Sequence, residues 1–375
     1  MTLVLRISQF LGYFPRSLNS SRILPRKYKW IRFLYFIPIL FHCLLVAVNI
    51  FMVAISIKMQ RQEIHSPKNP GTASASVQVS FVTTMKATCH IFTTVYIKVA
   101  ILLKGAQLSK FCSEFEELVT SSNQLVVHNF KKKCENRFHP KFWMELFAWM
   151  IACTVFIGDM WDVFLLNENR SAARRSISLF TIVIPATLGY LHSIFPLMLG
   201  HYLNRYLEIL QRLRESPAIL VQLRMQIYSQ MRQNVNLFMR IFGTSVVIDI
   251  AHSIGRVIFS AYFLAESSDR LIPSERGHVA DAGTILWYSY LVFMICKKGS
   301  QVRNLSEDVI EKLEDDAKSE FILGRDQKGS KSDNPKLKQI LVQTDYFNVD
   351  LGLIAPIVGT VTTNLIVLIQ FKKGS

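Results

Sequence analysis

The sequence predicts an all-α membrane protein with seven transmembrane helices, helical extensions on the cytoplasmic side and the N-terminus inside. Half of the 375 residues are hydrophobic, 19% are charged, and the mean hydropathy is +0.25. The apolar residues gather in long runs, and runs of about 18 or more are typical of membrane-spanning helices. Seven basic residues and no acid precede position 33. The positive-inside rule therefore assigns the segment 1–32 to the cytoplasm.

The first half of the chain, 33–200, is expected to hold four transmembrane helices. Their expected bounds are 33–57, 79–103, 142–166 and 177–200. The Pro- and Gly-containing loop 58–78 is placed outside, and the basic region 104–141 is placed inside.

A cytoplasmic helical extension is expected at 201–234. Leucines recur at helical spacing across the end of the fourth span and into this extension: Leu199, Leu203, Leu207, Leu210 and Leu213. Pro217 is expected to break this helix, and a second amphipathic helix to follow it.

The segment 235–296 is expected to hold the fifth and sixth transmembrane helices, at 235–264 and 282–296. The segment 297–348 is expected to be a cytoplasmic anchor helix, 304–322 with Ser306 as its N-cap, followed by a Gly/Ser/Lys/Asp linker at 324–338. The last transmembrane helix is expected at 349–371. An odd number of spans then leaves the C-terminus outside.

Several function classes are excluded by what the sequence lacks. The net charge is +16, but no zinc-knuckle spacing or interleaved aromatic-basic patch supports nucleic-acid binding, and the charge is explained by the loops that flank the spans. No Gly-rich phosphate loop, nucleophile elbow or HExxH motif is present, so we expect no enzyme, no catalytic residue and no cofactor. The six cysteines and the histidines His42, His192 and His201 have no metal-ligand spacing, so no metal site is expected.

Polar and aromatic residues recur at similar depth in the outer halves of four expected spans. They are Lys86, His90, Trp161, Asp162, His252, Arg256, Trp287 and Tyr288. A charge near the middle of a bilayer costs about 3 kcal/mol or more, so these residues need a reason to be there. They predict either a ligand pocket open to the outside, or interhelical ion pairs with interfacial aromatic residues.

The sequence contains one glycosylation sequon at a suitable place. Asn169 begins Asn-Arg-Ser in the short loop after the third span, which is expected to lie outside. The sequons at Asn19 and Asn304 fall in segments that are expected inside.

The most specific motif is the end of the last span, which runs from Thr363 to Phe371 and ends with Gln370-Phe371. It resembles the insect gustatory receptor family, whose last helix ends with Thr-Tyr, five hydrophobic residues and Gln-Phe. Asn364 stands where the family has Tyr. The upstream residues 347–351 and Gly359 are also similar to that family. The motif covers about 25 residues, whereas the resemblance in topology and loop lengths covers the whole chain.

The resemblance implies a tastant-gated, non-selective cation channel in the plasma membrane of chemosensory neurons. It implies a homotetramer, or a hetero-oligomer with related receptors, in which four copies of the last helix line one pore. Val367, Gln370 and Phe371 share one helix face, and with Thr363 they are the expected pore and gate residues. The implied partners are a small-molecule tastant, permeating cations and the lipid bilayer. The sequence does not indicate which tastant, although Leu365 stands where sugar receptors carry Glu.

Three other classes remain as alternatives. An insect odorant receptor channel subunit shares the topology, but the Gln-Phe ending favours the gustatory family. A G-protein-coupled receptor requires the opposite topology and motifs that are missing from the third and seventh spans. A secondary transporter predicts inverted repeats, and the sequence contains none.

Overall fold

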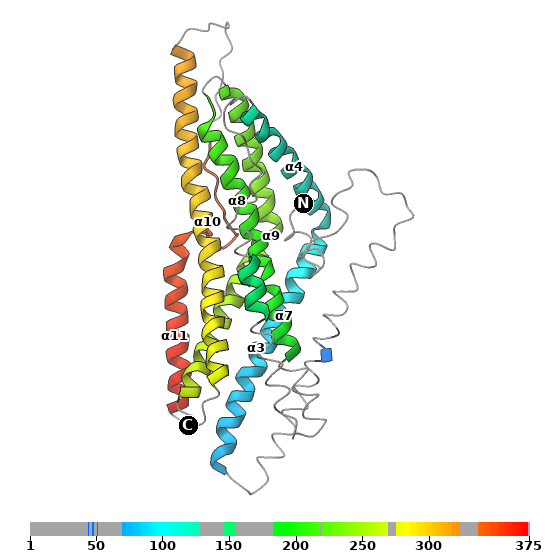
Figure 1. Cartoon of the computed structure of the whole chain (residues 1–375), viewed down its shortest axis with the longest axis vertical. Helices are drawn as coiled ribbons and strands as arrows, with labels where there is room; N and C mark the ends of the chain where they lie inside the picture. The colour runs from blue at the N-terminus through cyan, green and yellow to red at the C-terminus, as the bar shows by residue number, and fades with distance from the viewer. Residues whose placement is uncertain are drawn as a thin grey trace, which may run out of the picture.

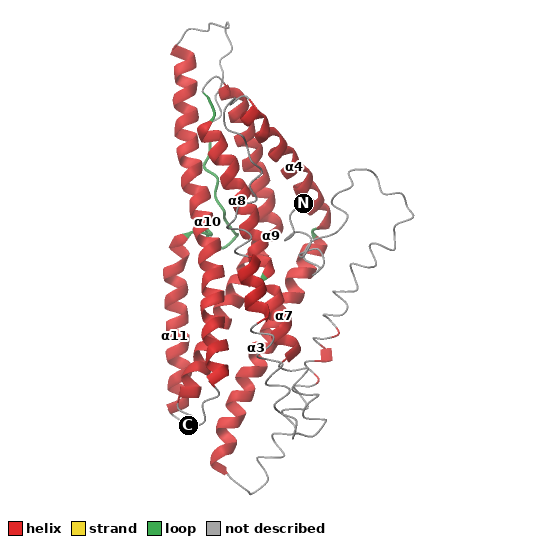
Figure 2. Ribbon diagram, viewed as in Figure 1, coloured by secondary structure: helices red, strands yellow, loops and turns green. Residues whose placement is uncertain are grey.

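The computed structural model describes residues 70–127, 146–154, 183–217, 220–268, 275–322 and 337–373, together with Leu44, Ala47, Val48 and Phe51. The elements in these ranges are helices, and one isolated antiparallel bridge joins Gln343 to Asn348 (Figure 2). The all-α class is therefore confirmed for the described part of the chain.

The helices form one elongated bundle (Figure 1). In chain order they are α3 (Pro70–Leu103), α4 (Gly105–Val127), α7 (Ile184–His192), α8 (Ile194–Glu215), α9 (Val221–Ser268), α10 (Glu275–Ile322), the 3-10 turn η5 (Leu351–Leu353) and α11 (Ile354–Lys373). Residues 146–154 are also helical and fall within the expected third span. Most of the first span, most of the third and most of the linker 324–338 lie outside the described residues.

Helices that were expected to be separate are continuous in the second half of the chain, whereas the expected bilayer boundaries at 234/235 and 296/297 remain predictions. α9 runs through position 235 without a break, and α10 joins the expected sixth span to the anchor helix, so each is one helix of 48 residues. Ser306 is consequently not an N-cap: its hydroxyl donates to the Arg303 carbonyl at 2.7 Å and accepts from the Ile340 amide at 3.2 Å. The segment 304–322, which was expected to be a separate helix, is therefore the second part of α10.

The second expected span begins earlier than predicted and ends at Leu103, as predicted. α3 begins at Pro70, inside the expected loop 58–78, because proline is well tolerated in the first turn of a helix. At its other end it bends by 73° into α4. The Lys104 ammonium stabilises this bend by donating to the carbonyl oxygens of Arg240 and Ile241 on α9, at 2.7 and 3.2 Å.

α4, α8 and the adjoining ends of α9 and α10 form one half of the bundle, which we name the anchor (Figure 1). The expected leucine stripe of α8 faces its core, since Leu199, Leu203, Leu210 and Leu213 are buried. α8 ends at Glu215, just before Pro217, as predicted. In this core, burial raises the pKa of Tyr206, so its hydroxyl keeps its proton and donates to Asn234 Oδ1 at 2.6 Å.

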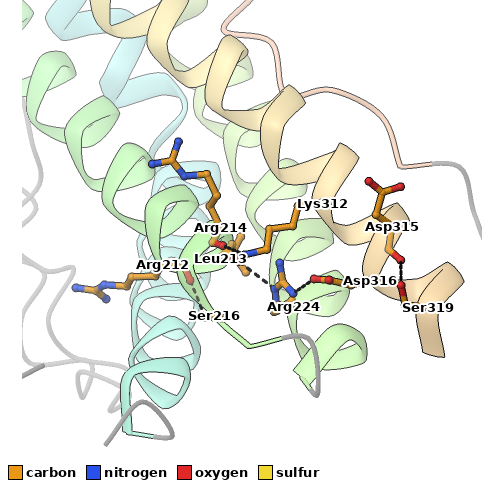
Figure 3. A network of polar contacts seen from close by, with 9 residues as sticks. All are labelled: Arg212, Leu213, Arg214, Ser216, Arg224, Lys312, Asp315, Asp316 and Ser319. Carbon is orange, nitrogen blue, oxygen red and sulfur yellow. Dashed lines mark hydrogen bonds and ion pairs between the residues drawn. The ribbon is translucent and has the colours of Figure 1, made fainter. Parts of the chain in front are cut away.

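An ion pair joins α9 to α10 inside the anchor (Figure 3). The Arg224 side chain is fully buried; it donates to Asp316 Oδ2 at 2.5 Å and to the Leu213 carbonyl at 2.9 Å. Nearby, Lys312 donates to the Arg214 carbonyl. These contacts connect α10 to the neighbouring helices α8 and α9, about 90 to 100 residues earlier in the chain.

The segment 337–350 runs along α10 and positions the start of α11. The Arg303 guanidinium pairs with Asp350 at 2.7 Å, and the same carboxylate accepts from the Gly352 amide at 2.9 Å. Gly299 on α10 is required here, because a Cβ atom at this position would overlap the Val349 carbonyl. α11 itself begins at Ile354, five residues after the expected start of the last span.

Two described helices are long and apolar enough to cross a membrane, α9 and α11, and the bent pair α3–α4 is a third if it counts as one span. The end of α11 and the ends of α9 and α10 that face each other lie at the same end of the bundle (Figure 1). The total of seven spans and the side on which each loop lies remain predictions.

Candidate functional site

Four of the predicted ligand residues meet in the interior of the bundle, away from the anchor. They are His90 on α3, His252 and Arg256 on α9, and Tyr288 on α10, and each is at least 94% buried. His252 is central: its Nε2 lies 2.5 Å from His90 Nδ1, and its ring is 5.7 Å from that of Tyr288. The fold therefore brings together residues of three helices, and His90 and His252 are neighbours although 162 positions separate them in the sequence.

The remaining predicted residues do not join this group in the described structure. Trp287 is half-buried and stacks on Tyr290, with ring centroids 5.9 Å apart. Lys86 lies on α3, but its side chain is outside the description. Trp161, Asp162 and the sequon at Asn169 lie outside the described residues altogether.

The structure adds residues that the sequence argument did not select. His192 Nε2 lies 3.0 Å from Asp249 Oδ1, and the His192 ring is 5.5 Å from that of His252. Tyr190, also on α7, shares a hydrogen bond of 3.0 Å with Thr284 on α10. The sequence could have indicated Asp249, because Asp249, His252, Ser253 and Arg256 recur at helical spacing on one face of α9.

His192, Asp249 and His252 bring one ligand-type atom each to within 4.8 Å of one another. Two imidazoles and a carboxylate are donors that zinc accepts. Spacing along the chain could not show this grouping, because α7 and α9 meet only in the fold. The expectation that the chain binds no metal stays a prediction, which a chelator tests directly.

Arg256 has an unusual environment. Its guanidinium lies over the rings of Tyr190 and Tyr288, at 4.8 and 5.2 Å from the ring centroids. Within the described part of the chain, none of its Nε, Nη1 and Nη2 atoms has a hydrogen-bond partner. Buried polar groups in proteins are almost always hydrogen-bonded, so a buried cation without hydrogen bonds requires an explanation.

A cavity of about 280 Å³ adjoins this residue between α3 and α9. Its walls include Phe92, Ile248 and Phe259, its surface is almost entirely apolar, and His252 and Arg256 are also among its lining residues. An apolar space with few polar groups is the usual form of a small-molecule site. The arrangement can therefore hold a small ligand that combines an apolar body with a polar or charged group.

Three of the four predicted pore residues lie on the side of α11 that its own chain leaves uncovered. A half-buried stripe packs toward α9 and consists of Ile354, Ile357, Val361, Leu365, Leu368 and Ile369. Thr363, Val367 and Gln370 are exposed, and the side chain of Phe371 lies outside the description. Asn364, at the position of the family's Tyr, is exposed and donates its amide to the Thr360 carbonyl of its own helix at 2.8 Å.

The chain shares its fold with a solved insect receptor. It is similar to the olfactory receptor OR5 of Machilis hrabei in complex with eugenol, with a TM-score of 0.59, 10% identity, and coverage of 98% of this chain and 97% of that chain. It is also similar to a second structure of OR5 from Machilis hrabei, with a TM-score of 0.57, 11% identity and the same coverage. No protein-family model and no curated protein sequence matches. At this identity the likeness establishes the fold of an insect olfactory receptor over almost the whole chain.

Proposed function

We propose that this chain is a subunit of a ligand-gated, non-selective cation channel in the plasma membrane, and that it is a gustatory receptor activated by a small-molecule tastant. The fold shared with OR5 supports an insect chemoreceptor. The Gln370-Phe371 ending, which resembles the gustatory family, supports the finer assignment.

The observation that carries the channel proposal is the exposure of α11. The apolar stretch at Leu351–Gln370 has a mean hydropathy of 2.0, yet none of its residues is fully buried inside the chain. A helix of this kind is covered by lipid, by other subunits or by both. Its uncovered face carries Thr363, Asn364 and Gln370, which are poorly suited to lipid and well suited to a neighbouring helix or a water-filled pore.

In the proposed assembly, four chains place this face around one axis. Val367 and Phe371 then form apolar rings that block ions by dewetting when the pore is narrow. Gln370 offers amide oxygens to a passing cation when the rings widen. The partner subunits are copies of this chain or related receptors.

The proposed tastant pocket includes His90, His252, Arg256 and Tyr288, which the fold brings together. Lys86, Trp161, Asp162 and Trp287 remain proposed contributors to its outer wall. OR5 has been solved with eugenol, so a small organic molecule is a reasonable kind of ligand for a protein of this fold. That same likeness favours an odorant receptor channel subunit as the second candidate function.

The experiment that tests the proposal is current recording from cells that express this chain alone. A panel of tastants and volatile odorants is applied, and untransfected cells are the control. We expect a non-selective cation current in response to a tastant. A response to volatile odorants alone would favour the odorant receptor, whereas a response that needs G-protein signalling would contradict the channel.

A further inference from the structure

Arg256 is a buried cation with no counter-charge in the described structure. Its side chain is 98% buried, forms no ion pair and makes no hydrogen bond through Nε, Nη1 or Nη2. Asp249, which lies on the same face of α9, is already engaged with His192. Removing an arginine from water without a partner is costly, so the empty donors indicate that a further group belongs at this place.

The two tyrosines stabilise the charge but leave the donors of the guanidinium unused. Cation–π contacts act through the ring face, and they do not replace hydrogen bonds at the N–H groups. Tyr288 directs its hydroxyl to the Gly189 carbonyl at 3.0 Å, and Tyr190 shares its hydroxyl with Thr284. The aromatic walls therefore hold Arg256 in position, and the missing partner has to supply acceptor oxygens.

Other donors near Arg256 are also without partners. Ser253 and Ser260 lie three residues before and four residues after Arg256, so they share its face of α9, and both hydroxyls are buried without hydrogen bonds. His252 Nδ1, one turn away, is buried and has no partner either. A planar guanidinium with hydroxyl groups beside it forms a donor set that fits a carboxylate.

The neighbouring cavity determines what else the ligand carries. It is lined by Phe92, Ile248 and Phe259, so a bare inorganic anion would leave most of it empty. Its volume of about 280 Å³ is at the lower end of the usual range for small-molecule pockets, about 300–1,000 Å³. A small acid with a short aliphatic or aromatic body matches both features.

We propose that Arg256 binds the carboxylate of a small organic acid, whose apolar body occupies the cavity between α3 and α9. This inference rests on the proposed function, because it names the chemical class of the ligand at the proposed pocket. It also explains why a charge is placed among apolar helices: the cation is the group that recognises the ligand.

The test measures binding to the purified full-length chain by its thermal unfolding midpoint. The probes are straight-chain carboxylates from acetate to decanoate and phenylacetate, each at a pH where it is ionised, and the methyl esters of the same acids. We expect at least one acid to raise the midpoint in a saturable way, with its ester about 10- to 100-fold weaker, because a charge-assisted hydrogen bond is lost. Failure of every acid, or equal effects of acids and esters, would overturn the proposal.

Three variants separate recognition from folding. Arg256→Met removes the charge and keeps an apolar side chain, so the ligand-free chain should remain folded while the acid-dependent shift disappears. Arg256→Lys keeps the charge without the planar fork, and should show a reduced shift. Arg224→Met removes a buried arginine in the anchor and should keep the full acid-dependent shift relative to its own baseline. A normal shift in Arg256→Met would overturn the assignment.

Two further probes distinguish the source of the anionic group. Sodium chloride and inorganic phosphate test a bare anion, and phosphatidylglycerol in mixed micelles tests a lipid headgroup. A shift that depends on Arg256 and is reproduced by either probe would overturn the organic-acid assignment. This binding assay is independent of any current, so it tests the site separately from the channel. Acid binding without channel activity would contradict the proposed function and leave the acid site intact. Channel activity without acid binding would contradict the acid site and leave the proposed function intact.

Discussion

The ion pair between Arg224 and Asp316 predicts that removing the acid costs more stability than removing the arginine. Arg224 is fully buried, whereas the Asp316 side chain is 20% exposed. Asp316→Asn therefore leaves a buried guanidinium without a counter-charge, and water reaches only one side of the site. Breaking a buried pair in this way costs about 3–5 kcal/mol, and the exposure of Asp316 places this case at about 3 kcal/mol.

Arg224→Met should cost less, about 1–2 kcal/mol. The carboxylate that remains can be hydrated, and the main loss is the hydrogen bond to the Leu213 carbonyl. Combining Arg224→Met with Asp316→Leu should recover most of the stability, because no charge is then left without a partner.

The assay is the thermal unfolding midpoint of the purified full-length chain, followed by size-exclusion chromatography of a fluorescent fusion. At about 2 °C per kcal/mol, Asp316→Asn should lower the midpoint by about 6 °C. Asp315→Asn is the matched control: it lies next to Asp316 on α10, and its pair with Lys318 at 3.4 Å is exposed, so its effect should be below about 1 °C. Equal shifts in Asp315→Asn and Asp316→Asn would refute the reasoning.

Three further predictions concern topology, modification and metal. An epitope tag at the N-terminus should be stained only in permeabilised cells, and staining of intact cells would reverse the topology. Asn169→Gln should remove any glycosidase-sensitive mass of the receptor, and a persistent shift would mean that another loop lies outside. A zinc chelator should leave the agonist response unchanged. A metal would be assigned to His192, Asp249 and His252 if the chelator removed the response, added zinc restored it, and His192→Ala made the response insensitive to the chelator.

The sequence predicted the helical class and the buried stripe of α8, because both follow from periodicity, which local residues carry. It did not predict that α9 and α10 are each one continuous helix. Polar residues such as Ser306 signal a cap in isolation, but here a distant amide, that of Ile340, satisfies the hydroxyl in mid-helix. Whether a serine such as Ser306 starts a new helix or lies within a longer one depends on such tertiary contacts.

The candidate site was predicted in part for a similar reason. His90, His252, Arg256 and Tyr288 were selected because each is costly within a membrane span, and the fold places them together. His192 lacks any local partner and was set aside, yet its partner Asp249 comes from another helix at 3.0 Å. Contacts between helices depend on packing angles and register, which the spacing along one helix does not encode.

The central claim is that α11 lines a cation pore, and one comparison of currents tests it most directly. Gln370→Arg and Gln370→Glu place opposite charges at the same exposed position of the pore face. With surface expression matched to wild type, Gln370→Arg should nearly abolish the agonist-evoked cation current, while Gln370→Glu should keep or increase it. Unchanged current and selectivity in both variants, or an equal loss in both, would contradict a pore at this face.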